Sequence, residues 1–301
     1  MTALSATDIS VRDELSRPSK SRHATDIAAR IVMWLSFLVA MVPLGWILWS
    51  AVSKGYHLLL SSDWWTKSQR NITTSDFGGG ARHAIEGTLI TGFITSLIAV
   101  PIGVLTAVYL VEYGRGSLAR AVSFTVDILS GVPSIVAALF IYAIWVTGLN
   151  QQRVAFAVCL ALVLLMIPTV VRSTEEMLKL VPNELREASY ALGVPKWITV
   201  TRIVLRTALS GIVTGVLLGL ARVMGETAPL LILTVYSTSF NQDVAKGAFG
   251  TLPTMINNDR ADLAMPFANE RMWAAALTLI LIILLLNLLG RMVAHFGSVR
   301  K

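Results

Sequence analysis

Two charged side chains, Arg222 and Glu226, lie inside a long apolar run over residues 207–236. At the centre of a bilayer each charge costs about 2.5–3.5 kcal/mol, so such residues are rare there and are usually functional. Four residues apart on a helix, the two side chains share one face and can pair. A guanidinium group is planar, permanently charged and able to bind two oxygens of an oxyanion. The pair therefore predicts either a pathway for an anionic solute or a salt bridge that fixes this helix to a neighbour.

A second candidate site is the sequence Ser-Gly-Val-Pro-Ser over residues 130–134, inside another apolar run. Gly and Pro together interrupt a helix, and a break at membrane depth is tolerated only where it faces protein or a watery cavity. A half-helix that begins near Ser134 would direct its backbone N–H groups and the positive end of its dipole at an anion. A kink that serves only packing explains the same residues equally well.

The composition of the chain indicates an integral membrane protein. Of its 301 residues, 54% are hydrophobic and 14% are charged, which is typical of a chain with long membrane-spanning runs. The net charge of +7 fits cytoplasmic loops rich in Lys and Arg better than a nucleic-acid partner. Four scattered histidines give no metal-ligand spacing, and no Gly-x-x-x-x-Gly-Lys-Ser/Thr motif is present. The chain itself is therefore not expected to be an enzyme, to hydrolyse ATP, or to need a metal or a cofactor.

The apolar runs predict six transmembrane helices. They cover residues 31–52, 87–111, 122–146, 154–171, 207–236 and 272–290. The first run is longer than the apolar core of a signal peptide, and its tryptophans suit a permanent span. Residues 1–30 are predicted to form a mostly disordered cytoplasmic tail. Lys and Arg are about twice as frequent in the segments that are cytoplasmic if both termini lie inside the cell, and this bias predicts that orientation.

A polar segment over residues 182–206 separates the fourth and fifth spans. Asn183 is a plausible N-cap for a short helix with one apolar face, which Gly193 would end. Pro195 fits the first position of a second helix that continues into the next span. The segment therefore predicts a helix, a sharp break and a second helix, a shape suited to being gripped by another protein in the cytoplasm.

Four short motifs resemble those of a known family. The sequence Glu187-Ala188-Ser189, followed by Gly193 and then by Ile203 and Leu205, resembles the EAA loop of ABC-importer permeases, with Ser189 in place of the second Ala and Arg206 in place of the final Pro. The other three resemble segments of phosphate-specific ABC importer permeases, of the PstA type more than the PstC type. They are Ala-Ile-x-Gly-Thr-Leu at 84–89, Gly-Val-Pro-Ser-Ile at 131–135 and Ala-Arg-x-x-Gly-Glu-Thr-Ala-Pro-Leu at 221–230.

This resemblance implies a fold. The expected protein is an all-α integral membrane protein with six transmembrane helices in the type I ABC importer permease architecture. Residues 31–83 would hold the first span and an external loop. Residues 84–296 would form the permease core, with five spans and a cytoplasmic coupling helix near 183–193, and residues 297–301 a cytoplasmic tail.

The resemblance also implies a function, the import of inorganic phosphate across the bacterial plasma membrane by alternating access, coupled to partner ATPases through the EAA loop. The expected substrate-pathway residues are Arg222, Glu226, Thr227 and Ser134. The expected ATPase-docking residues are Glu187, Ala188, Ser189 and Gly193. A permease for sulfate or molybdate is the nearest alternative, and an ion-gradient-driven anion carrier is a more distant one.

The implied partners are a second homologous permease subunit of the PstC type, two copies of an ATP-binding subunit that hydrolyses ATP, and an external phosphate-binding protein. The binding protein is expected to dock on the loops over residues 54–82 and 237–271. The lipid bilayer surrounds the spans, both termini are expected in the cytoplasm, and no nucleic acid is expected to bind.

Overall fold

The structure is a computed structural model that describes residues 20–73, 76–262 and 264–297. It divides into two compact units that meet between Ser50 and Ala51. Of the tail predicted over residues 1–30, the part up to residue 19 lies outside the described residues. Residues 20–30 are helical, because helix α2 begins at Lys20. The tail predicted at 297–301 lies outside the described residues beyond Gly297.

Helix α2, Lys20–Leu60, carries the first apolar run. Its segment Ala24–Leu60 is long and apolar enough to cross a membrane, which extends the predicted span of 31–52 at both ends. The last turns of α2 belong to the second unit. There Gly55 lies so close to helix α13 that a Cβ atom at this position would be 2.7 Å from the carbonyl oxygen of Trp273.

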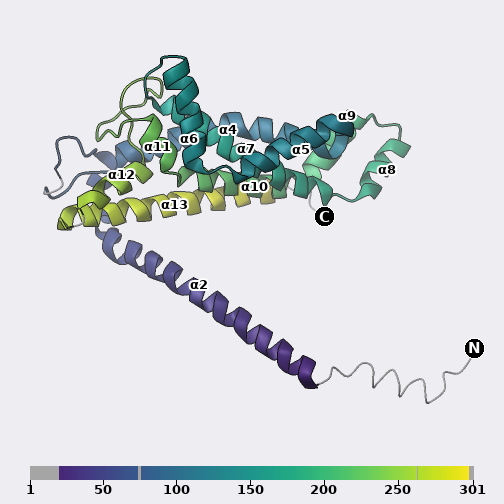
Figure 1. The fold of residues 1–301 in the computed structure, drawn as a ribbon, viewed down its shortest axis with the longest axis horizontal. Helices are drawn as coiled ribbons and strands as arrows, with labels where there is room; N and C mark the ends of the chain where they lie inside the picture. Colours follow the sequence, from purple (N-terminus) through teal and green to yellow (C-terminus); the bar gives the residue numbers. More distant parts are fainter. Residues whose placement is uncertain (1–19, 74–75, 263, 298–301) are drawn as a thin grey trace, which may run out of the picture. The chain divides into compact units, whose positions relative to one another are not determined.

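Four further long helical segments form the body of the second unit. They are α4, Arg82–Val108; α7, Ala155–Lys179; α10, Leu205–Met224; and α13, Pro266–Gly297. Helix α4 packs along α7, and α10 packs against both α7 and α13 (Figure 1). Small residues allow these close contacts. A Cβ atom at Gly103 of α4 would lie 2.7 Å from the side chain of Val170 in α7.

The predicted third span is bent at the predicted break. Helix α5, Gly116–Gly131, ends where Val132 and Pro133 begin, and α6, Ser134–Tyr142, continues through the π-helical turn η2, Ala143–Gly148. The two parts meet at 106°. The described chain therefore has five helices that are long and apolar enough to span a membrane, or six if this bent pair counts as one span.

The predicted fifth span, 207–236, is not one helix. Helix α10 ends at Met224, Gly225 to Thr227 form a break, and a short helix α11, Ala228–Leu233, follows. The continuous-helix prediction was wrong because apolar composition concealed Gly225 and Pro229, which favour a helix end and a new helix start. Three short elements complete this end of the unit. They are α3, Ser62–Thr66; α12, Leu252–Asp259; and the 3₁₀ turn η4, Arg260–Asp262.

The polar segment between the fourth and fifth spans has the predicted form. Helix α8, Asn183–Ala191, is followed by Gly193 at a φ of +75°, where glycine is favoured. The second helix begins with α9, Lys196–Ile198, and continues through the π-helical turn η3, Thr199–Val204, into α10. The residue before the first helical residue is Pro182, so the predicted N-cap at Asn183 is off by one position. Helices α8 and α9 lie at the opposite end of the unit from α11 and α12 (Figure 1).

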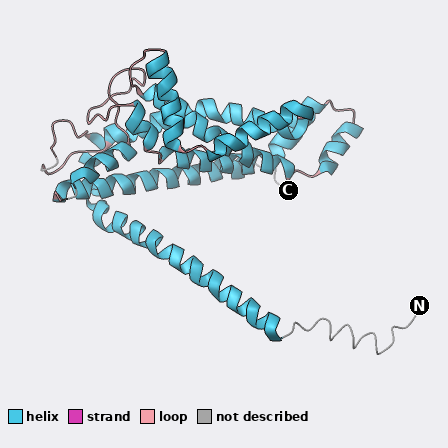
Figure 2. Cartoon of the chain, viewed as in Figure 1, coloured by secondary structure: helices cyan, strands magenta, loops and turns pink. Residues whose placement is uncertain are grey.

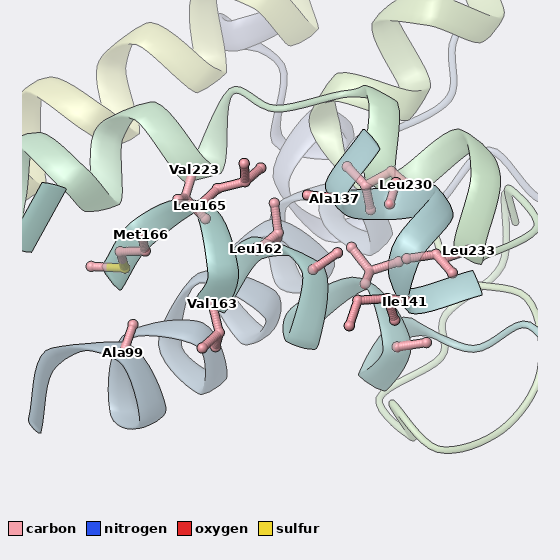
Figure 3. Packing of buried hydrophobic residues seen from close by; sticks show 14 of the residues in the cluster. Ala99, Ala137, Ile141, Leu162, Val163, Leu165, Met166, Val223, Leu230 and Leu233 are labelled. Carbon is pink, nitrogen blue, oxygen red and sulfur yellow. The ribbon is translucent and has the colours of Figure 1, made fainter. Parts of the chain in front are cut away.

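The described residues are helices joined by loops, with no strand among them (Figure 2). The largest apolar cluster joins five helices and is drawn in Figure 3. Ala99 comes from α4, Ile141 from α6, Met166 from α7, Val223 from α10 and Leu233 from α11. The cluster therefore fixes the two short helices α6 and α11 against the long ones, close to both helix breaks.

Candidate functional site

Arg222 lies in the last turn of α10 and lines a cavity of about 130 Å³. The other lining residues come from α5, the break after it, and α7. They are Leu129, Ser130, Val132, Leu165, Pro168, Thr169 and Arg172. The Arg222 side chain is 56% exposed, so the structure places its guanidinium group in an open space beside the bend of the third span.

The predicted pair of Arg222 with Glu226 is weak. The Arg222 Nε and Glu226 Oε1 atoms are 3.9 Å apart, which is longer than a hydrogen bond. Glu226 lies beyond the end of α10, so the two residues do not share the regular helix face that the sequence predicted. The ion pair between Arg222 and Glu226 is therefore a loose one within the described chain.

A second arginine, Arg172 in α7, lines the same cavity and was not among the predicted site residues. Its guanidinium group lies 2.5 Å from Asp127 Oδ1 of α5 and 2.5 Å from Glu175 Oε2. It also donates to the backbone oxygen and the hydroxyl of Ser123. Because the fourth span was predicted to end at residue 171, Arg172 was counted as a loop charge. Helix α7 in fact continues to Lys179.

The other predicted pathway residues lie near the breaks but do not line this cavity. Ser134 is the first residue of α6, and Thr227 is the residue that precedes α11. Both are half-buried, and so is Glu226. On the side of the bend, the cavity wall includes Ser130 and Val132. The cavity therefore brings together Arg222 and Arg172 among the charged residues of these spans, and the roles of Ser134, Glu226 and Thr227 stay predictions.

The predicted docking residues have two different environments. Glu187 and Ala188 are exposed on α8, and Gly193 forms the turn after it. Ser189 is buried, and its hydroxyl lies 2.8 Å from the hydroxyl of Thr199 in η3. Ser189 therefore holds the two helices of the segment together, while Glu187 and Ala188 present a surface.

At the end of the unit with α11 and α12, the two predicted external loops are tied together through buried polar groups. Arg271, at 3% exposure, donates to the backbone oxygens of Thr73, Asp76 and Gly78. Burial raises the pKa of the Asp259 carboxyl, an effect that the nearby Arg271 opposes. The loop after α2 therefore has a fixed position against α12 and α13.

The comparisons with known proteins identify the family. Residues 99–296 match the family model described as "Binding-protein-dependent transport system inner membrane component". The PstA 1 phosphate transport system permease protein of Mycobacterium tuberculosis strain H37Rv is 48% identical over 305 residues, which cover 99% of this chain and 97% of the relative. The corresponding PstA protein of Mycobacterium leprae is 50% identical over 289 residues, which cover 92% of this chain and 94% of the relative. The chain belongs to the binding-protein-dependent transport permeases, in the PstA group.

Solved structures support the permease fold. A bacterial ABC transporter that imports alginate has a chain that matches with a TM-score of 0.61 at 14% identity, over 91% of this chain and 98% of that one. The MetNI methionine ABC transporter in an inward-facing conformation matches with a TM-score of 0.57 at 21% identity, over 73% of this chain and 96% of that one. At such low identity the likeness concerns the fold alone. This likeness confirms the predicted all-α permease architecture. The family and the apolar helices together show a multi-pass membrane protein of a transport system and not a catalytic enzyme.

Proposed function

We propose that this permease is the membrane-spanning subunit of an ATP-driven importer that carries inorganic phosphate into the cell. The main support is the cavity beside the bend of the third span, where the poorly neutralised Arg222 and the carboxylate-bound Arg172 lie together. Arginine suits a tetrahedral oxyanion because its N–H groups match two oxygens at once. The mycobacterial relatives match over nearly their whole length and are named as phosphate transport permeases, which favours phosphate over sulfate or molybdate.

The partners in this proposal are a PstC-type permease, two copies of an ATP-binding subunit and an external phosphate-binding protein. Exposed apolar side chains at the α8 end of the unit favour a protein partner there. They include Leu180, Leu192 and Trp197, of which Leu192 is 82% exposed. Both termini and this end lie in the cytoplasm in the proposed orientation. The binding protein docks at the opposite end, on the loops over residues 54–82 and 237–271.

In this mechanism ATP binding draws the docking helices of the two permeases together, and the spans change between outward-open and inward-open arrangements. The breaks at Val132 and Pro133 and at 225–227 are the positions where spans three and five can change direction without breaking a regular helix. Arg222 lines the cavity beside the first break, lies just before the second, and attracts phosphate electrostatically. Because a pathway must also release its solute, a single poorly neutralised cation suits transport better than a tight multidentate site.

The test is phosphate uptake by the complex with Arg222→Gln in this subunit, reconstituted in vesicles with its partners. Removing one charged hydrogen-bonding group weakens binding by about 1.5–3 kcal/mol, so we expect phosphate uptake to fall by about 10- to 150-fold. The amount of ATP-binding subunit that stays bound to the complex should not change. The control is Arg120→Gln, an exposed arginine at the start of α5. Excess sulfate should not compete with phosphate. Uptake equal to wild type in Arg222→Gln would refute the role of this residue, and effective competition by sulfate would refute the choice of substrate.

A further inference from the structure

The second span ends near a charged residue, Glu112, which contacts the polar segment over residues 182–206, called the docking segment from here on. Helix α4 continues through the π-helical turn η1, Tyr109–Tyr113, which contains Glu112. The Glu112 side chain is 5% exposed, and its Oε1 atom accepts from Arg186 of α8 at 2.8 Å from Nη2 and 3.1 Å from Nε. A buried carboxylate bound to two N–H groups of one guanidinium is a strong and directional contact.

Arg186 joins three parts of the chain at this point. Besides Glu112, it donates to the backbone oxygens of Leu178 and Val181, at 3.0 and 2.6 Å. These carbonyl groups belong to the end of α7 and the turn that follows it. A single side chain of the docking helix therefore holds the cytoplasmic ends of the second and fourth spans together.

Lys196, in the second helix of the docking segment, contacts Glu112 through its backbone oxygen and not its side chain. Its ammonium group donates to the backbone oxygen of Glu112 and lies 4.9 Å from the centre of the Tyr113 ring. Both helices of the docking segment thus contact Glu112, through different atoms. Each helix of the segment therefore has its own direct contact with the end of the second span.

The other end of the same helix contacts the first residue of α12 and the segment before it. The Thr88 hydroxyl accepts from the backbone N–H of Leu252 at 2.9 Å. Gly87 lies so close to this segment that a Cβ atom there would be 1.9 Å from the backbone oxygen of Gly250. The helical segment Arg82–Tyr113 has 32 residues, and at 1.5 Å per residue it spans about 48 Å.

We propose that Glu112 is the positioning residue through which movement of the docking helix enters the membrane bundle, and that the second span carries this movement to the loop before α12. The proposal rests on the proposed function, because it requires a partner ATPase on α8. The fourth and fifth spans flank the docking segment in sequence, and α8 also contacts the start of the fifth through the Ser189–Thr199 hydrogen bond. The second span is remote in sequence and is joined by an ion pair that can transmit a pull as well as a push.

The test uses the complete complex, purified with its ATPase and reconstituted with the external binding protein, and compares Glu112→Ala with wild type. In this variant Arg186 keeps its bonds to the backbone oxygens of Leu178 and Val181, so α8 should stay in place. We expect ATPase subunits to remain bound and basal ATP hydrolysis to be unchanged. Stimulation of ATP hydrolysis by phosphate-loaded binding protein, and phosphate uptake per ATP, should each fall about tenfold, within the usual range of coupling between distant sites.

Two further variants separate coupling from folding. Glu112→Gln keeps an acceptor oxygen for Arg186 and should recover most of the stimulation. Glu176→Gln changes an exposed acid in the last turn of α7 and should behave as wild type. Wild-type stimulation in Glu112→Ala, or loss of bound ATPase in that variant, would overturn the proposal. A wild-type complex that does not respond to phosphate-loaded binding protein would instead refute the proposed function.

Discussion

Replacing Thr88 by valine tests how firmly helix α4 is joined to the start of α12. The Thr88 hydroxyl accepts from the Leu252 N–H at 2.9 Å and donates to the backbone oxygen of Ala84 at 2.8 Å. Thr88 and Leu252 are 2% and 0% exposed, so water does not replace the lost acceptor. Valine has nearly the same shape as threonine. The change therefore leaves a buried N–H group without a partner, which costs about 1–3 kcal/mol.

This cost should appear as local opening of α12. Since 1.4 kcal/mol is a factor of ten in an equilibrium constant, opening should increase about 5- to 150-fold. Hydrogen–deuterium exchange with mass spectrometry measures this increase in peptides over Leu252–Asp259 of the purified complex. Thr88→Ser is the matched control, because it keeps the hydroxyl and loses only a methyl group. Equal exchange in the Val and Ser variants would show that the hydroxyl does not hold the joint.

Two other predictions concern packing and pH. In α10, a Cβ atom at Gly215 would lie 2.4 Å from Ser173 Cβ, whereas one at Gly219 would be 3.6 Å from its nearest neighbours. We therefore expect Gly215→Ala to destabilise the complex by about 1–3 kcal/mol and Gly219→Ala to be tolerated; equal melting temperatures would contradict this packing. The pKa of Asp259 is raised in the folded protein, so its carboxyl stays protonated to a higher pH in the folded protein than in the unfolded chain. Stability should then fall as the pH rises from about 3.9 through the raised pKa. Asp259→Asn should flatten this profile, and an unchanged profile would contradict the assignment.

Hydropathy predicted where spans exist much better than where helices end. The apolar runs gave all five long helices of the described chain and the bent pair, because the need to satisfy backbone groups in lipid leaves few alternatives to helices. Ends were harder, because polar residues can extend a helix beyond the membrane. Helix α7 continues past Val171 to Lys179 with its charges paired at spacings of three and four residues. These pairs were a sequence signal that the helix continued.

The candidate site was predicted in part. Arg222 was found because a charge inside an apolar run is conspicuous, and the bend at Val132 and Pro133 because both residue types disrupt helices. Arg172 was missed because its position in the cavity depends on α5 and α7 packing together. The buried position of Ser189 and the ion pair of Glu112 with Arg186 also depend on tertiary contacts. Periodicity within one segment does not encode such contacts.

The two arginines of the cavity differ in how closely carboxylates pair with them, and this difference suggests which of them an incoming anion meets first. Arg172 already has two carboxylate partners at 2.5 Å, so an incoming anion would have to displace one of them. Arg222 has a carboxylate only at 3.9 Å, and its position in the last turn of α10 places it near the negative end of the helix dipole, which stabilises its charge. We therefore infer that phosphate meets Arg222 first. On this inference, Arg172 binds the anion only if Asp127 or Glu175 first moves away from its guanidinium group.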